Sequence, residues 1–212
     1  MTVINPSFLR FFFPWILWKG PDDGRDVFLT FDDGPRPDFT PGILDILKTE
    51  GIQASFFLTG RNLILYPGIV ERMKREGHTI GNHGFSHVSL GLKKTDWIRL
   101  EIERTDQALE KITGEKPYFF RPPYGRFDHR FRRLMRETGH RLVLWSLLSL
   151  DYREGNSKAL IARVQNRMHP GAVIVFHDGH ENGAVTMRVL ADLIRGLKNA
   201  YYRPLALNTL RG

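Results

Sequence analysis

The sequence predicts a single α/β domain with about seven parallel strands, arranged as a barrel of fewer than eight strands or as an open doubly wound sheet. Short runs rich in β-branched and aromatic residues alternate with amphipathic helical patterns along the 212 residues. Strands that alternate with helices pair in parallel through right-handed crossovers. Neither a linker nor a low-complexity tract interrupts the alternation, so we expect one domain.

Three strands are predicted in the first half of the chain, at 27–31, 54–59 and 79–82. The helix between the first two begins at Thr40-Pro41, which supply an N-cap and a proline at the first helical position, and it ends at Gly51. A second helix spans Pro67–Glu76 and is closed by Gly77.

Four further strands are predicted in the second half, at 118–120, 141–147, 172–176 and 204–207. The helix between Thr95 and Thr113 carries its apolar residues at a spacing of 3.6 and stops at Gly114. Similar stripes predict helices around 127–138, 160–168 and 187–197.

The first 25 residues form a predicted aromatic segment that packs on a domain of residues 26–212. Its apolar run, Phe11–Trp18, is interrupted by Pro14 and is far shorter than the roughly 20 residues that span a bilayer. Only Arg10 supplies a basic charge shortly before the run, so we expect no cleavable signal. The aromatic rings can also lie at a membrane interface. The sequence therefore leaves a cytoplasmic and a membrane- or cell-wall-associated location open.

Composition excludes several classes of protein. With 42% hydrophobic and 25% charged residues the chain can bury its own core, and the lack of cysteine excludes thiol catalysis, thiolate metal sites and disulfides. A formal net charge of +8 favours anionic partners. The densest basic stretch is Arg126, Arg130, Arg132, Arg133, Arg136 and Arg141. This stretch is either a solvated helix face or a surface for a polyanion; no nucleic-acid motif is present, and we expect no nucleic-acid partner.

Polar residues follow the predicted strands at the same end each time. They are Asp32-Asp33, His83, Arg121, Asp151 and His177-Asp178. The carboxyl ends of parallel strands meet on one face of such a fold, where active sites are built. We therefore expect these side chains to converge.

Two of these patterns suggest chemistry. His83 and His87 are four residues apart, so both rings can face one metal, and an added carboxylate completes a donor set typical of catalytic zinc. Two prolines after Arg121 stiffen a turn in which the Tyr124 N–H can serve as an oxyanion donor. Taken alone, Asp32-Asp33 also fits a surface turn, the motif after Arg121 a proline-rich loop, and His177 a core histidine.

Taken in order, five motifs resemble those of the polysaccharide deacetylases (carbohydrate esterase family four). They are Thr30-Phe31-Asp32-Asp33-Gly34-Pro35, Gly81-Asn82-His83 through Ser86-His87, Arg121-Pro122-Pro123-Tyr124-Gly125, Ser149-Leu150-Asp151-Tyr152, and Val173 to His177. The resemblance spans roughly residues 26–207. It implies a distorted (β/α) barrel with about seven strands and one catalytic domain.

The resemblance also implies a role for each residue. Asp33, His83 and His87 would hold a divalent metal, most often zinc in this family. Asp32 would be the general base, and Arg121 would orient it and balance its charge.

On the same basis, His177 would be the general acid with Asp151 as its partner, and the Tyr124 backbone N–H would bind the oxyanion. The activity implied is metal-dependent removal of N-acetyl groups from amino sugars of a chitin-, chitooligosaccharide- or peptidoglycan-type glycan. An unactivated amide needs an activated water and a protonated leaving amine, which these residues can supply.

Three positions depart from the family pattern. Gly84 replaces a common Ser or Thr, so a hydroxyl that would brace the loop is missing; Leu148 replaces a frequent Asp, and Tyr152 a frequent Trp. None removes a proposed ligand or proton-transfer group. We expect these positions to affect the lining of the groove, and therefore the substrate.

Two alternative functions stay open. The same site can act on another carbon–nitrogen bond, such as an N-formyl sugar lipid or a cyclic amide. A protein of another class, a non-catalytic module, would bind anionic glycan or nucleic acid through the arginine-rich face, with an affinity that falls steeply with salt. The sequence does not indicate the oligomeric state.

Overall fold

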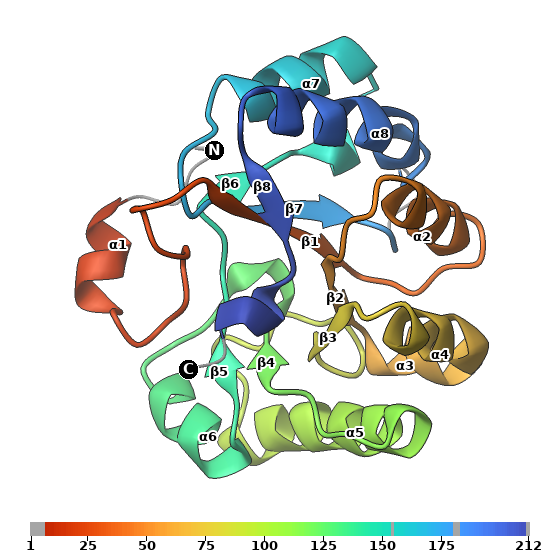
Figure 1. The fold of residues 1–212 in the computed structure, drawn as a ribbon. Helices are drawn as coiled ribbons and strands as arrows, with labels where there is room; N and C mark the ends of the chain where they lie inside the picture. The colour runs from red at the N-terminus through yellow and green to blue at the C-terminus, as the bar shows by residue number, and fades with distance from the viewer. Residues whose placement is uncertain (1–6, 154, 180–182, 211–212) are drawn as a thin grey trace.

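A curled sheet of parallel strands forms the centre of the molecule (Figure 1). This computed structural model describes residues 7–153, 155–179 and 183–210. The strands are β1 Asp26–Asp32, β2 Ser55–Leu58, β3 Thr79–Asn82, β4 Phe119–Phe120, β5 Arg141–Leu142, β6 Leu147–Leu148, β7 Val173–His177 and β8 Arg203–Leu205. The α-helices are α1 Ser7–Phe12, α2 Thr40–Thr49, α3 Gly60–Leu65, α4 Pro67–Arg75, α5 Thr95–Thr113, α6 Phe131–Thr138, α7 Ser157–Gln165 and α8 Gly183–Asn199. The 3₁₀ turns are η1 Pro123–Gly125, η2 Asp151–Arg153 and η3 Leu207–Leu210.

The order of strands shows how far the sheet curls. It runs β5-β4-β3-β2-β1-β7-β6, with β8 paired to β1 beside this path. β5 and β6 are the two ends of the order, yet only residues 143–146 separate them in the chain. Those residues can span at most about 18 Å when extended. The two edges must therefore approach each other, and the predicted barrel of about seven parallel strands is confirmed.

The N-terminal segment runs along one of these edges. Leu17 forms a parallel bridge with Val143, and the N–H of Leu17 donates to the Leu142 oxygen at 2.9 Å. The neighbouring Ile16 and Trp18 are buried, whereas Phe11 and Phe12 are exposed. Residues 1–6 of the segment lie outside the described residues, as do 211–212 of the second region. The boundary after residue 25 stays a prediction.

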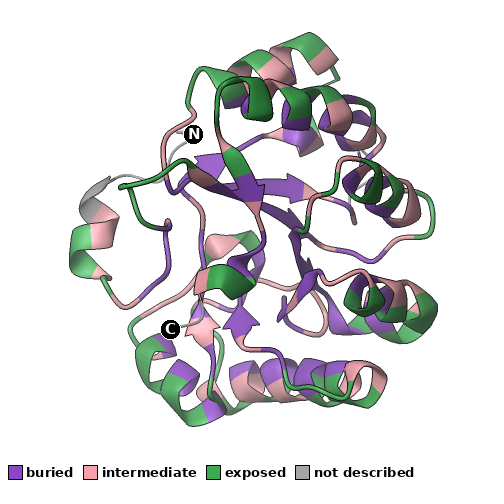
Figure 2. Ribbon diagram, viewed as in Figure 1, coloured by how far each residue is buried: buried purple, intermediate pink, exposed green. Residues whose placement is uncertain are grey.

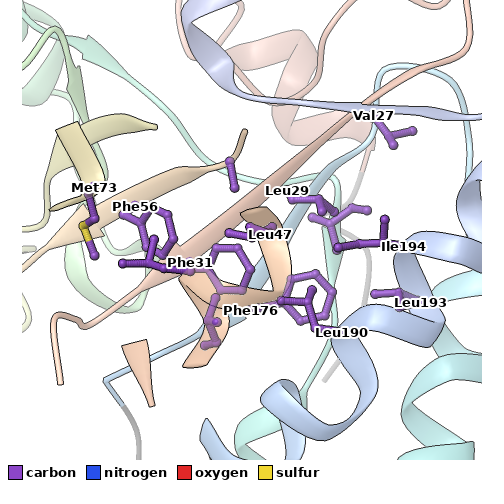
Figure 3. Packing of buried hydrophobic residues seen from close by; sticks show 14 of the residues in the cluster. Val27, Leu29, Phe31, Leu47, Phe56, Met73, Phe176, Leu190, Leu193 and Ile194 are labelled. Atoms are coloured by element: carbon purple, nitrogen blue, oxygen red, sulfur yellow. The ribbon is translucent and has the colours of Figure 1, made fainter. Parts of the chain in front are cut away.

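Strand alternation separates two kinds of packing. On β1, Val27, Leu29 and Phe31 face outward into a cluster with residues of α2 and α8 (Figure 3). Phe28 faces inward, where it packs with Phe57, Phe119 and Val173, residues of β2, β4 and β7. Figure 2 shows the result: buried strands enclosed by helices whose outer faces are exposed. The barrel interior is thus filled by aromatic and aliphatic side chains below the carboxyl ends of the strands.

The predicted strand 141–147 is wrong, because it splits into β5 and β6. β5 pairs with β4 and β6 pairs with β7, on opposite edges of the sheet, so the chain has to cross between them. The apolar run conceals this crossing, since the residues on both sides of it are buried.

Three smaller expectations also need correction. Helix α3 was not predicted; Leu63 is buried in it, but Ile64 and Leu65 are exposed, so it lacks an amphipathic stripe. Thr40 is not an N-cap: it is the first residue of α2, and its hydroxyl accepts from the Arg36 N–H and donates to Asp178 instead. The last predicted strand, 204–207, is β8 at 203–205. No helix within the described ranges is long and apolar enough to cross a bilayer.

Candidate active site

A cleft of about 700 Å³ opens at the carboxyl ends of the strands. Six of the predicted site residues line it: Asp32, Asp33, His83, His87, Tyr124 and His177. The other two, Arg121 and Asp151, are buried and contact Asp32 and His177. The structure therefore brings all eight predicted residues together.

Strand register explains this convergence. Asp32 lies opposite His177 in the pairing of β1 with β7, and opposite Phe57 in the pairing of β1 with β2. Phe57 faces the interior. Since alternate residues of a strand share a face, the pleat that turns Phe28 inward also turns Asp32 inward, four positions further on.

Asp33, His83 and His87 form a compact cluster. The Nε2 atoms of His83 and His87 lie 3.2 and 2.8 Å from the Asp33 Oδ1, and one ligand atom from each residue lies within 4.8 Å of the others. Asp33 and His87 have left-handed backbones, with φ of 76° and 52°. Such strain persists only where the surrounding structure imposes it, and it is common at functional sites.

The donor set of this cluster fits a divalent cation. The Nδ1 of His83 lies 2.7 Å from the Arg121 carbonyl oxygen, which can only accept, so Nδ1 carries a proton and Nε2 of the neutral ring keeps its lone pair. Burial raises the pKa of the Asp33 carboxyl, but its close contacts with His83 and His87 and the positive charge of His177 lower it well below its usual range. One carboxylate and two imidazoles are ligands that zinc prefers.

Asp32 is held from behind by Arg121. This arginine is fully buried, and its Nη1 donates to the Asp32 Oδ1 at 2.6 Å and to the Thr30 hydroxyl at 2.9 Å. Its guanidinium lies 4.0 Å from the centre of the Phe57 ring. The other carboxylate oxygen of Asp32 is 4.0 Å from the His83 Nε2. One oxygen of Asp32 is therefore hydrogen-bonded to the Arg121 guanidinium, and the other faces the cluster of Asp33, His83 and His87.

His177 is held by Asp151 on the other side of the cleft. The Asp151 carboxylate accepts from the His177 ring at Nδ1, 2.8 Å away, and from the His177 backbone N–H at 2.7 Å. The Ser149 and Thr186 hydroxyls also donate to it, at 2.9 and 2.6 Å. Burial lowers the pKa of His177, but the charge and hydrogen bond of Asp151 outweigh this effect and raise the pKa to about 9. His177 is therefore a protonated imidazole at neutral pH.

Tyr124 lies at the mouth of the cleft. Its backbone is left-handed, with φ of 62°, and its ring is 4.9 Å from that of His87. The next residue, Gly125, has φ of 64°, and a Cβ there would lie 2.6 Å from the Trp145 ring. The turn after Arg121 thus packs tightly against the cleft wall.

Comparison with known proteins identifies this architecture. Residues 19–143, more than half of the chain, match the family model for polysaccharide deacetylase. The chain belongs to the polysaccharide deacetylase family. The resemblance expected from the five motifs is therefore confirmed, although Asp151 and His177 lie beyond the matched range.

Individual relatives share most of the chain. It is 38% identical over 181 residues to a peptidoglycan-N-acetylglucosamine deacetylase of Bacillus cereus, covering 82% of this chain and 66% of that protein, just under two thirds of its length. It is 33% identical over 189 residues to the peptidoglycan-N-acetylmuramic acid deacetylase PdaA of Bacillus subtilis, covering 87% of this chain and 71% of that protein.

Solved structures agree over the whole fold. A peptidoglycan N-acetylglucosamine deacetylase superposes with a TM-score of 0.89 at 35% identity, covering 92% of this chain and 91% of that one. A family 4 pseudoenzyme of Bacillus anthracis superposes with a TM-score of 0.85 at 25% identity, covering 91% of this chain and 67% of that one. The deacetylase fold therefore extends over β6, β7 and the helices beyond the family-model match.

Glu101, which was not predicted, supports the loop that carries the two histidines. This α5 residue is buried, and its Oε2 accepts from the Phe85 N–H at 3.1 Å and from the N–H and hydroxyl of Ser86, both at 2.8 Å. Glu101 lies three residues after Ile98 on the stripe of α5 that the sequence predicts to be buried. A carboxylate on that stripe was the signal that sequence reasoning missed.

The departures from the family pattern now have a structural setting. Gly84 has φ of 74°, and its N–H donates to the Asn82 side-chain oxygen at 2.7 Å. Asn82 and Glu101 thus support the loop, which lacks the hydroxyl that Ser or Thr would supply at position 84. Leu148 and Tyr152 both line the cleft, and the Tyr152 ring packs edge-on against His177.

Asp178 is a second buried carboxyl that the sequence left without a role. Its Oδ2 accepts from the Thr40 hydroxyl at 2.6 Å, and a Cβ on Gly34 would lie 2.2 Å from the same atom. Burial raises the pKa of Asp178 to about 7, against the effect of the Thr40 hydrogen bond. This carboxyl therefore packs under the turn that follows Asp33.

The basic stretch of the sequence does not form a single free patch. Arg130 pairs with Asp128 at 2.7 Å, and the Nε of Arg133 pairs with Glu137 at 2.6 Å. Arg126 instead lines the cleft.

Proposed function

We propose that this chain is a metal-dependent hydrolase that removes N-acetyl groups from amino sugars of a peptidoglycan-type glycan. One observation carries the proposal: a cluster of one carboxylate and two imidazoles lies in the same cleft as Asp32, which is held by Arg121, and His177, which is held by Asp151. The relatives named above act on N-acetylglucosamine and N-acetylmuramic acid of peptidoglycan, which supports a substrate of this class.

The Asp33 side of the cleft would activate the water. A divalent cation, for which the donors favour zinc, supplies Lewis acidity when bound, lowering the pKa of a water and polarising a carbonyl group. Asp33, His83 and His87 would hold that cation. The free oxygen of Asp32 accepts the proton of the attacking water, while Arg121 holds the carboxylate in place and balances its charge.

His177 would protonate the leaving group. Its Nδ1 is fixed on Asp151, which leaves Nε2 to donate a proton to the amide nitrogen as the C–N bond breaks. An unprotonated amide anion is too basic to leave, so this step is required for an N-acetyl group. The Tyr124 N–H would donate to the oxygen that becomes negative during attack. The products are acetate and a free amino sugar.

Acetate release tests the proposal directly, and it is needed because a family member with the same fold is described as a pseudoenzyme. We expect release from N-acetylglucosamine oligomers and from peptidoglycan strands. Release should stop after dialysis against a chelator and return with Zn²⁺. Asp33→Asn should lower kcat/KM by about a thousandfold or more, since the lost Lewis acid is worth several kcal/mol.

A substrate panel sharpens this test. N-formyl sugars and cyclic amides, assayed beside the N-acetyl glycans, report on the alternative carbon–nitrogen bonds. Turnover that is unchanged in the chelated Asp33→Asn variant would contradict the proposal. Faster release of formate than of acetate would indicate that the same site acts on an N-formyl substrate.

A further inference from the structure

Three arginines line the cleft beside the predicted catalytic residues. Arg61, Arg126 and Arg153 are exposed lining residues. They come from three elements: Arg61 from the start of α3, Arg126 from the chain just after η1, and Arg153 from the end of η2. α3, η1 and η2 follow β2, β4 and β6, which are not neighbours in the sheet. The arginines therefore approach the cleft from different sides.

Each of these arginines lies within two residues, along the chain, of a residue that belongs to the site or contacts it. Arg61 precedes Asn62, whose side-chain amide donates to the Asp33 carbonyl oxygen at 2.8 Å. Arg126 is two residues from Tyr124, and Arg153 is two residues from Asp151. A group bound by the three guanidinium ions would consequently lie near the acetamido group, within the same or an adjacent sugar.

Among the described residues, the acidic groups of the cleft do not pair with these arginines. Among the described residues that line it, the carboxylates are Asp32 and Asp33, and these are engaged by Arg121 and by the two histidines. In the described part of the chain no carboxylate lies within 4.0 Å of Arg61, Arg126 or Arg153. On the outer surface, by contrast, Arg130 and Arg133 are paired with acidic neighbours.

We propose that Arg61, Arg126 and Arg153 form a subsite for anionic groups of the substrate, so that the enzyme prefers an acidic N-acetylated glycan to a neutral one. The inference rests on the proposed function and narrows its substrate class. Guanidinium groups present paired donors that match carboxylate and phosphate oxygens. The aromatic side chains of Tyr124, Trp145 and Tyr152 line the same cleft.

Matched substrates separate charge from shape. Peptide-free strands of alternating N-acetylglucosamine and N-acetylmuramic acid carry one lactyl carboxylate per disaccharide. The same strands with every carboxylate converted to a methylamide are neutral, as are N-acetylglucosamine oligomers. We expect the lowest KM for the carboxylated strand, and we expect that advantage to shrink near 1 M NaCl, where the Debye length falls to about 3 Å. A nucleoside diphosphate N-acetylglucosamine tests phosphate as the source of the anion.

Arginine variants test the assignment. Arg61→Gln, Arg126→Gln and Arg153→Gln should each raise KM for the carboxylated strand about threefold, and the triple variant by roughly thirtyfold, as expected for exposed charge pairs that act independently. KM for the neutral oligomer should stay constant. Arg132→Gln removes an exposed positive charge from α6, outside the cleft, and is the matched control.

Two results would overturn the subsite: equal KM values for the carboxylated strand, the methylamide strand and the phosphate-bearing sugar, or a triple variant that weakens the charged and the neutral substrates equally. A preference confined to the phosphate-bearing sugar would identify phosphate as the anion that the subsite binds. Equilibrium binding of the strands, measured by calorimetry, distinguishes the two proposals. Charge-dependent binding without acetate release would contradict the proposed function alone, and charge-independent binding with acetate release would contradict the subsite alone.

Discussion

The two sides of the cleft each use a buried carboxylate to hold a histidine, but they hold it in different ways. Among the described residues, the Glu101 carboxylate accepts hydrogen bonds from the Phe85 and Ser86 N–H groups and from the Ser86 hydroxyl, in the loop between His83 and His87, and from neither histidine ring. Asp151 contacts both the backbone N–H and the ring of His177. The first carboxylate fixes the position of two proposed metal ligands. The second fixes position and protonation state together.

His83 and His177 have different partners because their proposed roles need different protonation states. A metal ligand has to keep its ring nitrogen free of a proton, so a neutral carbonyl oxygen, that of Arg121, is a suitable partner for the His83 Nδ1. A general acid has to stay protonated, so a carboxylate is a suitable partner for His177. Loss of Glu101 should therefore change metal affinity, whereas loss of Asp151 should change the pH profile.

Removing the His177 ring, the proposed proton donor, should have the largest effect on kcat/KM. For His177→Ala we expect kcat/KM on an N-acetyl glycan to fall by about 10³, within the range for loss of a general acid. An activated aryl acetate has a leaving group that needs no proton, so its hydrolysis should fall by about tenfold or less. Steady-state kinetics on both substrates measure the ratio. Equal losses on both would contradict the general-acid role and would leave His177 as a structural residue.

Removing the Asp151 charge should have an intermediate effect and a distinctive pH signature. His177 donates only in its protonated form, so wild-type kcat/KM should fall as pH rises through about 9. In Asp151→Asn the largest influence that remains is burial, which lowers the pKa of His177, so the alkaline limb should move to lower pH. We expect a loss of about a hundredfold at pH 8 and a smaller loss at pH 6.

Thr186→Val is the control for this shift. It removes one hydrogen bond to the Asp151 carboxylate and keeps the negative charge, so the alkaline limb should stay near its wild-type position. An Asp151→Asn profile that is displaced downward at every pH, without a change in the limb, would show that Asp151 only positions the ring.

The sequence was sufficient to predict which residues converge. The strands before Asp32, His83 and His177 were each predicted to within one or two residues, and parallel pairing then places their carboxyl ends on one face. The ordered motifs added the family, which the comparisons confirm. Local pattern and spacing are properties of the chain itself, so they could be read without the structure.

The sequence was insufficient where the outcome depends on packing between distant elements. The crossing at 143–146 follows from pairing with two different strands, β4 and β7, and not from any break in the apolar run. The contact of Glu101 with Ser86 depends on how α5 lies against the loop after β3. The three arginines that line the cleft could not be told from surface arginines such as Arg133, because only the fold decides which basic residues meet an acidic neighbour.

Removing the charge of Glu101 should have the smallest effect, and this effect should differ in kind from that of removing the charge of Asp151. Glu101→Gln keeps the shape of the side chain and removes the charge that strengthens three hydrogen bonds to the histidine loop. We expect Zn²⁺ affinity, measured by competition with a chelator, to fall about tenfold, as for other groups that orient metal ligands. The alkaline limb of the zinc-saturated enzyme should not move, because the ring of His177 is held by Asp151. Glu110→Gln removes an exposed charge from the same helix and should leave affinity unchanged. Wild-type affinity in Glu101→Gln, or a displaced alkaline limb, would contradict the division of labour between the two carboxylates.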